Sequence, residues 1–200
     1  MSPVTHFLTG WLVANAPDGF GRRGRALVTL AGVVPDADGL GLVAELLTRD
    51  SQRPLLWWTQ NHHVLGHNLL FGLLAAGAVT LLSKRRRWLT GALAFVSFYL
   101  HVLGDLVGAR GPDGDQWLIR YLWPFSDVGF TWAGQWELNA WPNFAVTGAA
   151  LLLTLMLARR RGYSPLEMIS SRADRALVQT LRNRFPLREG KGVSSHSTGA

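Results

Sequence analysis

The sequence has no cysteine and little charge, and both shortages narrow the kinds of protein it can encode. Without cysteine there is no disulfide framework, thiol nucleophile or cysteine-based zinc site. Charged residues make up 16% of the 200 residues, whereas an ordinary soluble domain has about a quarter. The first 21 residues contain no Lys or Arg, and we therefore expect no signal peptide. Any metal ion must be held by His, Asp or Glu.

Apolar residues are abundant and are gathered into long stretches. Hydrophobic residues reach 48%, with nine Trp and nine Phe, which excludes a disordered or fibrous chain. A transmembrane helix needs about 17 to 20 apolar residues, and three stretches approach this length, at residues 64–83, 88–109 and 144–158. Two shorter stretches, 4–16 and 26–34, are predicted half-spans or buried helices. The expected fold is all-α, a multi-pass helical membrane bundle with short N-terminal half-spans.

Basic clusters at residues 22–25, 84–87 and 159–161 each adjoin an apolar stretch. This pattern is typical of membrane flanks rather than of nucleic-acid binding, and no nucleic-acid partner is expected. Excess Arg and Lys in short loops marks the cytoplasmic side, which places the loop 110–143 outside. Seven of the nine tryptophans fall in segments assigned to that outer side. The predicted location is the bacterial inner membrane, in contact with membrane lipids.

Beyond residue 161, apolar positions recur every three or four residues between arginines over residues 166–185. This spacing predicts a basic amphipathic helix on the cytoplasmic side. It would lie on the anionic inner leaflet or, alternatively, dock a partner protein or nucleic acid. Residues 189–200 are predicted to be disordered. The expected organisation is a membrane domain over 1–158, a cytoplasmic helix over 159–188 and a tail over 189–200, with the oligomeric state left open.

Ionisable residues occur at one predicted depth in four separate segments. Counted from the nearest basic cluster at about 1.5 Å per helical residue, they lie roughly 17 to 27 Å above the inner face, near the outer end of the bundle. They are His6, Asp36, His67, His101 and Asp105. Such groups are costly within spans unless they are paired or hydrated, and they usually mark function. A shared metal ion would remove that cost.

The histidine spacings suit coordination, although each has a structural alternative. His101 and Asp105 are four residues apart, which places the imidazole and the carboxylate on one face of a helix. A buried hydrogen-bonded pair is the alternative. His62 converges with His67 only if it precedes the helix that carries His67. His63 is interpreted as a neighbour rather than a ligand.

The two aspartates of the N-terminal part flank one residue in a turn that begins at Pro35. Such a turn can aim both carboxylates at a common point. Asp36 could instead close an Asx turn, and Asp38 could be the N-cap of a helix over residues 40–47. His6 could be an ordinary interfacial histidine.

Five short motifs follow one another in an order that resembles a known family. They are Thr5-His6, Pro35-Asp36-Ala37-Asp38, the histidines of residues 62–67, His101-x-x-x-Asp105, and Leu122-Trp123-Pro124-Phe125-Ser126. Over residues 1–158 the chain resembles the YdjM-like family of predicted membrane-bound metal-dependent hydrolases. It is also distantly similar in pattern to zinc-dependent phospholipase C and P1 nuclease, helical enzymes with His and Asp ligands around several zinc ions.

The resemblance implies a set of metal ligands and a set of departures. The family's motif positions fall on His6, Asp36, Asp38, His62, His67, His101 and Asp105. The chain departs from the family at four neighbouring positions, His63, Gly66, Asn68 and Leu100, where the family usually has Arg, Thr or Ser. These departures concern residues that orient ligands and bear on substrate choice.

We expect one to three divalent metal ions, zinc in preference to manganese, because seven candidate ligands exceed what one tetrahedral zinc ion uses. Asp36 and Asp105 are the catalytic candidates, as a bridge between ions or as the base that accepts a proton from water. The expected reaction is hydrolysis of a phosphoester, lipid or lipid-linked, because Trp57, Trp58 and Trp123 would rim a site at the outer face. The alternatives are metal-ion or proton binding and transport, or a scaffold that recruits a partner through its basic tail.

Overall fold

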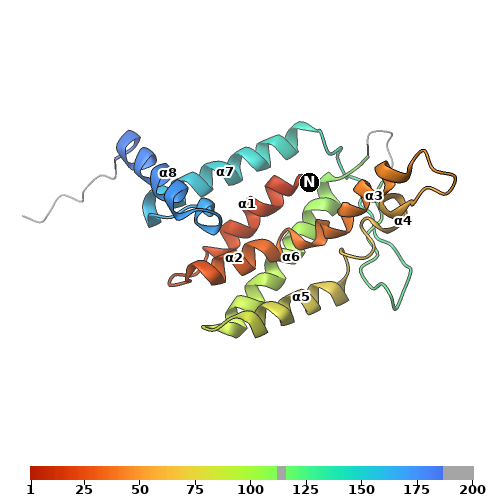
Figure 1. The fold of residues 1–200 in the computed structure, drawn as a ribbon, viewed down its shortest axis with the longest axis horizontal. Helices are drawn as coiled ribbons and strands as arrows, with labels where there is room; N and C mark the ends of the chain where they lie inside the picture. Colours follow the sequence, from red (N-terminus) through yellow and green to blue (C-terminus); the bar gives the residue numbers. More distant parts are fainter. Residues whose placement is uncertain (112–115, 187–200) are drawn as a thin grey trace, which may run out of the picture. The chain divides into compact units, whose positions relative to one another are not determined.

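The computed structural model describes residues 1–111 and 116–186, and the regular elements in these ranges are all helices (Figure 1). They are α1 (Pro3–Ala14), α2 (Arg22–Ala31), η1 (Val34–Leu40), α3 (Gly41–Thr48), α4 (Trp57–Asn61), α5 (Leu69–Leu82), α6 (Arg87–Gly108), α7 (Trp141–Arg161), η2 (Pro165–Met168) and α8 (Ser171–Arg184). Within the described ranges, β structure is limited to two isolated bridges. The all-α prediction is confirmed there, and the predicted tail 189–200 lies outside these ranges.

The chain divides into two compact units, Met1–Thr154 and Leu155–Ala200. In the first unit, α6 packs against α1, α2 and α5, and α1 packs against α2 (Figure 1). Glycine permits this packing, because a Cβ on Gly10 would lie 2.9 Å from the carbonyl oxygen of Thr29 and 2.9 Å from Oγ of Ser97. Helix α1 therefore lies directly against both α2 and α6.

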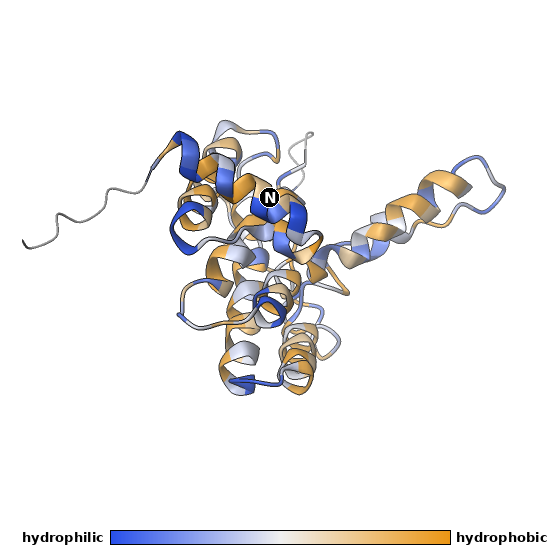
Figure 2. Ribbon diagram, turned by 60° about the vertical axis from the view of Figure 1, so that its left-hand side comes forward, coloured by the Kyte–Doolittle hydropathy of each residue, from blue (hydrophilic) through white to orange (hydrophobic). Residues whose placement is uncertain are grey.

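Two helices, α6 and α7, are long and apolar enough to cross a membrane. A third crossing would be the bent pair of α2 with residues 34–48, which turns by 53°. Most of the helices are coloured as hydrophobic and several turns as hydrophilic (Figure 2), and many large apolar side chains are exposed. Leu81 is 86% exposed, whereas His101 is 1% exposed. Exposed leucine with buried histidine inverts the pattern of a soluble protein, and the outer surface of the helices suits lipid.

The predicted span 64–83 is a shorter helix in the structure. Helix α5 begins only at Leu69 because the side chain of Asn68 accepts a hydrogen bond from the backbone N–H of Phe71 and caps the helix. Residues 62–68 instead form a loop, and α5 has 14 residues. The other two predicted spans correspond to α6 and α7, and the two half-spans correspond to α1 and α2.

The second unit contains the end of α7, η2 and α8. The predicted continuous helix over 166–185 is divided here, because η2 ends at Met168 and α8 starts at Ser171. The carboxylate of Asp174 accepts hydrogen bonds from the backbone N–H and the hydroxyl of Ser164, at 2.6 and 2.7 Å. These bonds fold the connection back onto α8.

Candidate metal site

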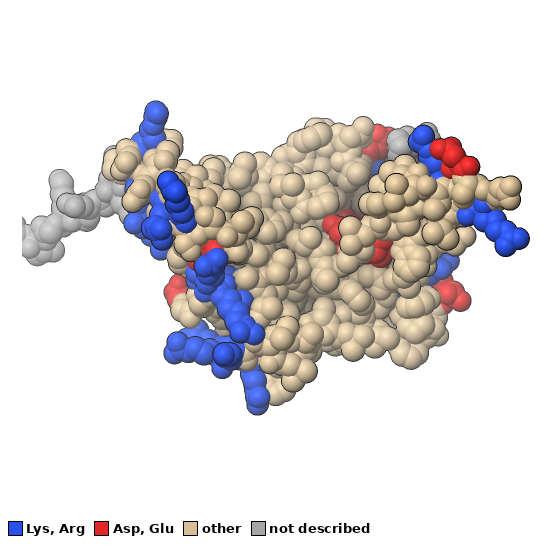
Figure 3. All heavy atoms as spheres, viewed as in Figure 1, with Lys and Arg blue, Asp and Glu red and all other residues tan. Residues whose placement is uncertain are grey.

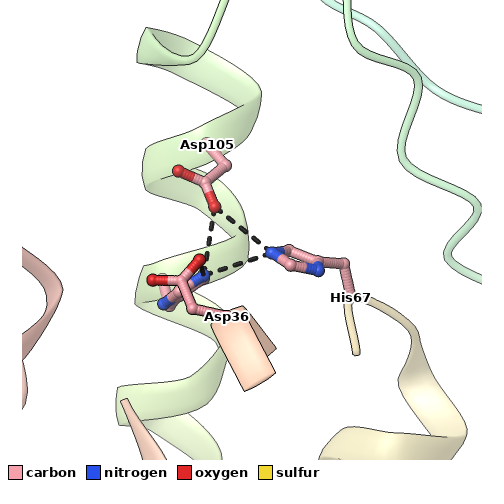
Figure 4. Close-up of side chains that lie close together, drawn as sticks. Asp36, His67 and Asp105 are labelled. Atoms are coloured by element: carbon pink, nitrogen blue, oxygen red, sulfur yellow. Dashed lines mark hydrogen bonds and ion pairs between the residues drawn. The ribbon is translucent and has the colours of Figure 1, made fainter. Parts of the chain in front are cut away.

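Four potential metal ligands meet inside the first unit. Asp36 comes from η1, His67 from the loop before α5, and His101 with Asp105 from α6. One ligand atom of each lies within 4.8 Å of all the others. Figure 4 shows Asp36, His67 and Asp105 pointing toward one another from these three elements. The three residues other than Asp36 are buried, and the Asp36 side chain is 22% exposed.

The geometry of α6 and of the loop before α5 explains why these residues meet. Within α6, the four-residue spacing brings Nε2 of His101 to 3.0 Å from Oδ2 of Asp105. The loop approaches η1 closely because residue 66 is glycine, and a Cβ there would lie 2.2 Å from the carbonyl oxygen of Pro35. His67 follows immediately and enters the cluster. One of the departures from the family pattern, Gly66, is thus needed for this approach.

The Nδ1 atoms of His67 and His101 are already committed to acceptors. Nδ1 of His101 lies 2.8 Å from the carbonyl oxygen of Gly32, and Nδ1 of His67 lies 3.3 Å from Oδ2 of Asp38. Because a carbonyl oxygen only accepts, Nδ1 of His101 must donate, and the same holds for His67 against an ionised carboxylate. In each neutral ring the available lone pair is then on Nε2. This arrangement is found in metal-ligating histidines.

The two Nε2 atoms face each other at 3.2 Å, beside carboxylate oxygens. Two lone pairs at this distance need a proton or a cation between them. Other separations are 3.3 Å from Nε2 of His67 to Oδ2 of Asp105 and 3.5 Å from Nε2 of His101 to Oδ1 of Asp36. Ligands about 2.0 to 2.1 Å from a tetrahedral zinc ion are about 3.3 Å apart. The donor set therefore fits such an ion.

Asp36 also provides an oxygen with no other role in the described chain. Its Oδ2 is buried and has no hydrogen-bond partner among the described residues. A buried carboxylate oxygen without a partner is costly, and a bound cation or a proton usually removes that cost. This orphaned atom supports a site for a cation and leaves one oxygen available for chemistry.

The three remaining predicted ligands adjoin the four-residue cluster. Nε2 of His6 lies 3.1 Å from Oδ1 of Asp105, and its ring stacks on that of His101 with centroids 3.6 Å apart. Asp38 uses one oxygen for Nδ1 of His62, at 2.8 Å, and the other for His67 and the backbone N–H of residue 66. The N-cap interpretation of Asp38 is wrong, because the N-cap of α3 is Leu40 with no side-chain hydrogen bond.

Asp105 is the most heavily engaged carboxylate of the cluster. Its Oδ1 contacts His6 and the amino group of Met1, and its Oδ2 contacts His67 and His101. Both oxygens are thus shared between groups from several elements. Asp105 therefore holds α1, the loop before α5 and α6 together at the site.

His63 lies closer to the cluster than the sequence indicated. Its Nε2 is 4.0 Å from Oδ2 of Asp105, and its side chain is buried. Burial lowers the pKa of His63 well below its ordinary value. The backbone has a φ of 66°, which is uncommon for a residue other than glycine and often marks functional sites. Adjacent histidines in a helix would point in different directions. Nothing in the sequence indicates that His63 has this left-handed backbone conformation.

A pocket of about 430 Å³ adjoins the cluster. It is lined by Trp58, His62, His63 and Trp117 among others. The ring of His62 stacks on Trp58 with centroids 3.7 Å apart, and Trp117 lies 4.3 Å from His63 between ring centroids. The pocket therefore brings aromatic surface and two histidines next to the buried carboxylates.

The fold and the site define an all-helical membrane protein with a buried His and Asp cluster suited to a divalent cation. In a comparison with family models, the model described as YdjM inner membrane protein matches residues 1–173. The chain therefore belongs to the YdjM inner membrane protein family, which the order of the five motifs indicated. Searches of curated proteins and of solved structures found no match.

Proposed function

We propose that this protein is a metal-dependent hydrolase that cleaves a phosphoester, lipid or lipid-linked, at the membrane surface. The observation that carries the proposal is the convergence of Nε2 of His67 and Nε2 of His101 at 3.2 Å on two carboxylates, beside a pocket lined with Trp58 and Trp117. Asp36, His67, His101 and Asp105 would hold the ion. Zinc is favoured by the imidazole and carboxylate donors, with manganese second.

The roles of the two carboxylates follow from their contacts. Asp105 is fully engaged by three histidines and the amino group of Met1, and it therefore acts as a ligand and not as the base. Asp36 keeps Oδ2 without a hydrogen bond in the described chain, and this atom is the one available to accept a proton from water. A divalent ion bound at the cluster would lower the pKa of water and stabilise negative charge on the attacked phosphoryl group.

The substrate class is suggested by the pocket and by the membrane. A volume of about 430 Å³ falls within the range of small-molecule sites and suits a headgroup-sized substituent. Trp58 and Trp117 present apolar and polar edges, as tryptophans at a membrane interface do. A phosphoester attached to a lipid would reach this pocket from the surrounding bilayer.

The test is hydrolysis by the detergent-purified protein with zinc or manganese added, using bis-p-nitrophenyl phosphate and phosphatidylglycerol in mixed micelles as probes. We expect nitrophenol or headgroup release by the wild type. His101→Ala should abolish both turnover and bound metal, measured by elemental analysis. Asp36→Asn, which keeps one carbonyl oxygen as a weaker ligand, should retain more metal than His101→Ala and lose about a hundredfold in rate or more. Asp127→Asn, an exposed residue outside the cluster, is the matched control.

Other results would favour the alternative functions. Zinc or proton flux into liposomes that depends on His101, without hydrolysis of either probe, would replace the hydrolase by a transport function. A cellular phenotype lost on deletion of the basic C-terminal segment but unchanged by His101→Ala would favour a scaffold. Unchanged metal content and turnover in His101→Ala would contradict the site itself.

A further inference from the structure

A second pocket lies in the first unit, formed by the α1–α2 turn and the α5–α6 turn. Its volume is about 510 Å³, and it shares no lining residue with the pocket beside the His and Asp cluster. Along α6, Asp105 is 18 residues from Arg87, which corresponds to about 27 Å of helix. This pocket is therefore separate from the candidate metal site and needs its own explanation.

Four of the eleven residues that line the pocket are cationic. Arg23 comes from the start of α2, and Lys84, Arg85 and Arg86 come from the turn before α6. No acidic residue is among the described residues that line the pocket. Figure 3 shows Lys and Arg side chains gathered where these two turns lie, whereas the flanks of the helices are largely uncharged. Such a concentration of positive charge around a cavity favours an anionic ligand.

The backbone of both turns is arranged around the same space. Helices α2 and α6 begin without a capping side-chain hydrogen bond in the described chain, and both helix starts line the pocket, through Arg23 and Arg86. Arg86, the N-cap of α6, has a left-handed backbone with a φ of 48°. Its guanidinium donates to the carbonyl oxygen of Asp18 at 2.8 Å and packs over Gly19, whose φ is 78°. Arg86 thereby ties the two turns together across one edge of the pocket.

The ligand must also suit apolar surface and a membrane boundary. Phe20 and Leu27 line the pocket together with the cations. Helix α6, a candidate membrane span, begins at Arg87, and the pocket therefore lies at the depth where a span meets lipid headgroups. Basic pockets between membrane helices are suited to anionic headgroups, whose acyl chains continue along the apolar helix surface.

We propose that this pocket binds the phosphate-bearing headgroup of an anionic membrane lipid. Arg23, Lys84 and Arg85 contact the phosphate, Arg86 holds the two turns in place, and Phe20 with Leu27 accommodates the adjoining part of the lipid. The bound lipid links α2 to α6 at the end opposite the cluster. The proposal stands on this pocket alone and is independent of the hydrolase function.

The test compares lipid binding by the detergent-purified full chain, measured by native mass spectrometry with phosphatidylglycerol and with phosphatidylcholine. We expect the wild type to retain phosphatidylglycerol preferentially. Lys84→Gln with Arg85→Gln should weaken its binding about 10- to 30-fold, and Arg23→Gln, from the other turn, should weaken it severalfold. Because all three residues are exposed, we expect the variants to keep the fold. Size-exclusion chromatography and circular dichroism test this expectation.

The matched control is Arg49→Gln with Arg53→Gln, which removes the same charge from exposed positions outside the pocket. This variant should bind phosphatidylglycerol as the wild type does. Equal weakening in both double variants, or equal retention of phosphatidylcholine, would overturn the proposal. Displacement of the lipid by millimolar inorganic phosphate, with no preference for the lipid, would overturn the lipid assignment in favour of free phosphate.

Discussion

Each buried histidine of the cluster has one nitrogen directed at a protein acceptor and the other at the shared centre. His101 uses the carbonyl oxygen of Gly32 and His67 uses Asp38. These outer contacts select the tautomer and fix the ring orientation. The capacity of single residues to bind a metal therefore depends on partners that do not themselves face the centre.

Asp38 provides the clearest test of this dependence. Its two oxygens serve His62, His67 and the backbone N–H of Gly66, and asparagine has only one carbonyl oxygen with which to accept. We expect Asp38→Asn to lower zinc affinity about 10- to 100-fold, measured by competition with a chromophoric chelator. Asp127→Asn should leave the affinity unchanged. Loss of one whole equivalent of metal would instead identify Asp38 as a direct ligand, as the family resemblance implies.

The pH dependence of metal binding follows from His67. Burial alone lowers the pKa of His67, but its hydrogen bonds to Asp105 and Asp38 outweigh that effect and raise the pKa to about 9 in the ion-free protein. The folded-state pKa thus exceeds the ordinary value of 6.5. Protonation of His67 then stabilises the metal-free fold fully below pH 6.5, and this contribution is lost as the pH rises through about 9.

A bound metal ion must displace this proton. We therefore expect zinc affinity to rise about tenfold per pH unit between about pH 7 and 9, while the unfolding midpoint of the metal-free protein falls over the same range. Chelator competition and thermal unfolding at several pH values measure the two trends. A zinc affinity that does not change with pH would show that His67 is not protonated in the metal-free protein.

Among the elements, close approach between helices and loops determines where the ligands lie. Gly66 lets the loop before α5 reach η1, and Gly10 lets α1 contact α2 and α6. His6, on α1, reaches Asp105 on α6 only because of the second approach. The positions of these elements therefore rest on glycines that have no chemical role in the cluster.

Two glycine substitutions separate helix packing from helix propensity. In Gly10→Ala the new methyl group would lie 2.9 Å from the backbone oxygen of Thr29, and we expect a loss of about 1 to 3 kcal/mol in the free energy of unfolding. Gly77→Ala, where nothing lies within 4 Å, should cause no loss. Thermal unfolding in detergent measures both. Equal stability of the two variants would contradict the packing of α1 against α2 in this structure.

For the molecule as a whole, the two units and the two ends of α6 organise the chemistry. The candidate ligands all lie in Met1–Thr154. The His and Asp cluster and the basic pocket involve opposite parts of α6, which itself is long and apolar enough to cross a membrane. A membrane with two different faces would therefore present different solutions and lipids to these two sites.

The orientation can be measured because the chain contains no cysteine. We expect an impermeant maleimide to label Ser51→Cys in intact bacterial spheroplasts, because the basic turn at residues 84–87 is predicted to be cytoplasmic. Lys84→Cys should be labelled only after the membrane is disrupted. The cysteine-free wild type is the control, and both positions are exposed. Labelling of both variants in intact spheroplasts would contradict the predicted orientation.

Local patterns were sufficient for much of the fold. Hydropathy over 20 residues marked α6 and α7, and the spacing of His101 and Asp105 within one helix placed both on one face. These features depend on neighbours within a few turns of helix. The late start of α5 was missed, because the capping contact of Asn68 and the tight fit of Gly66 outweigh the apolar character of the residues that follow.

The sequence alone specifies a helical membrane protein, because apolar runs and basic flanks are local features. It also requires the ionisable groups within the spans to be paired, because an unpaired charge there is costly. Folding in three dimensions selected which groups meet. It divided the candidates into Asp36, His67, His101 and Asp105 around one centre and Asp38 behind His67, and it turned His63 inward through a left-handed backbone. Such assignments depend on distances of a few ångströms between segments far apart in the chain, which no local pattern encodes.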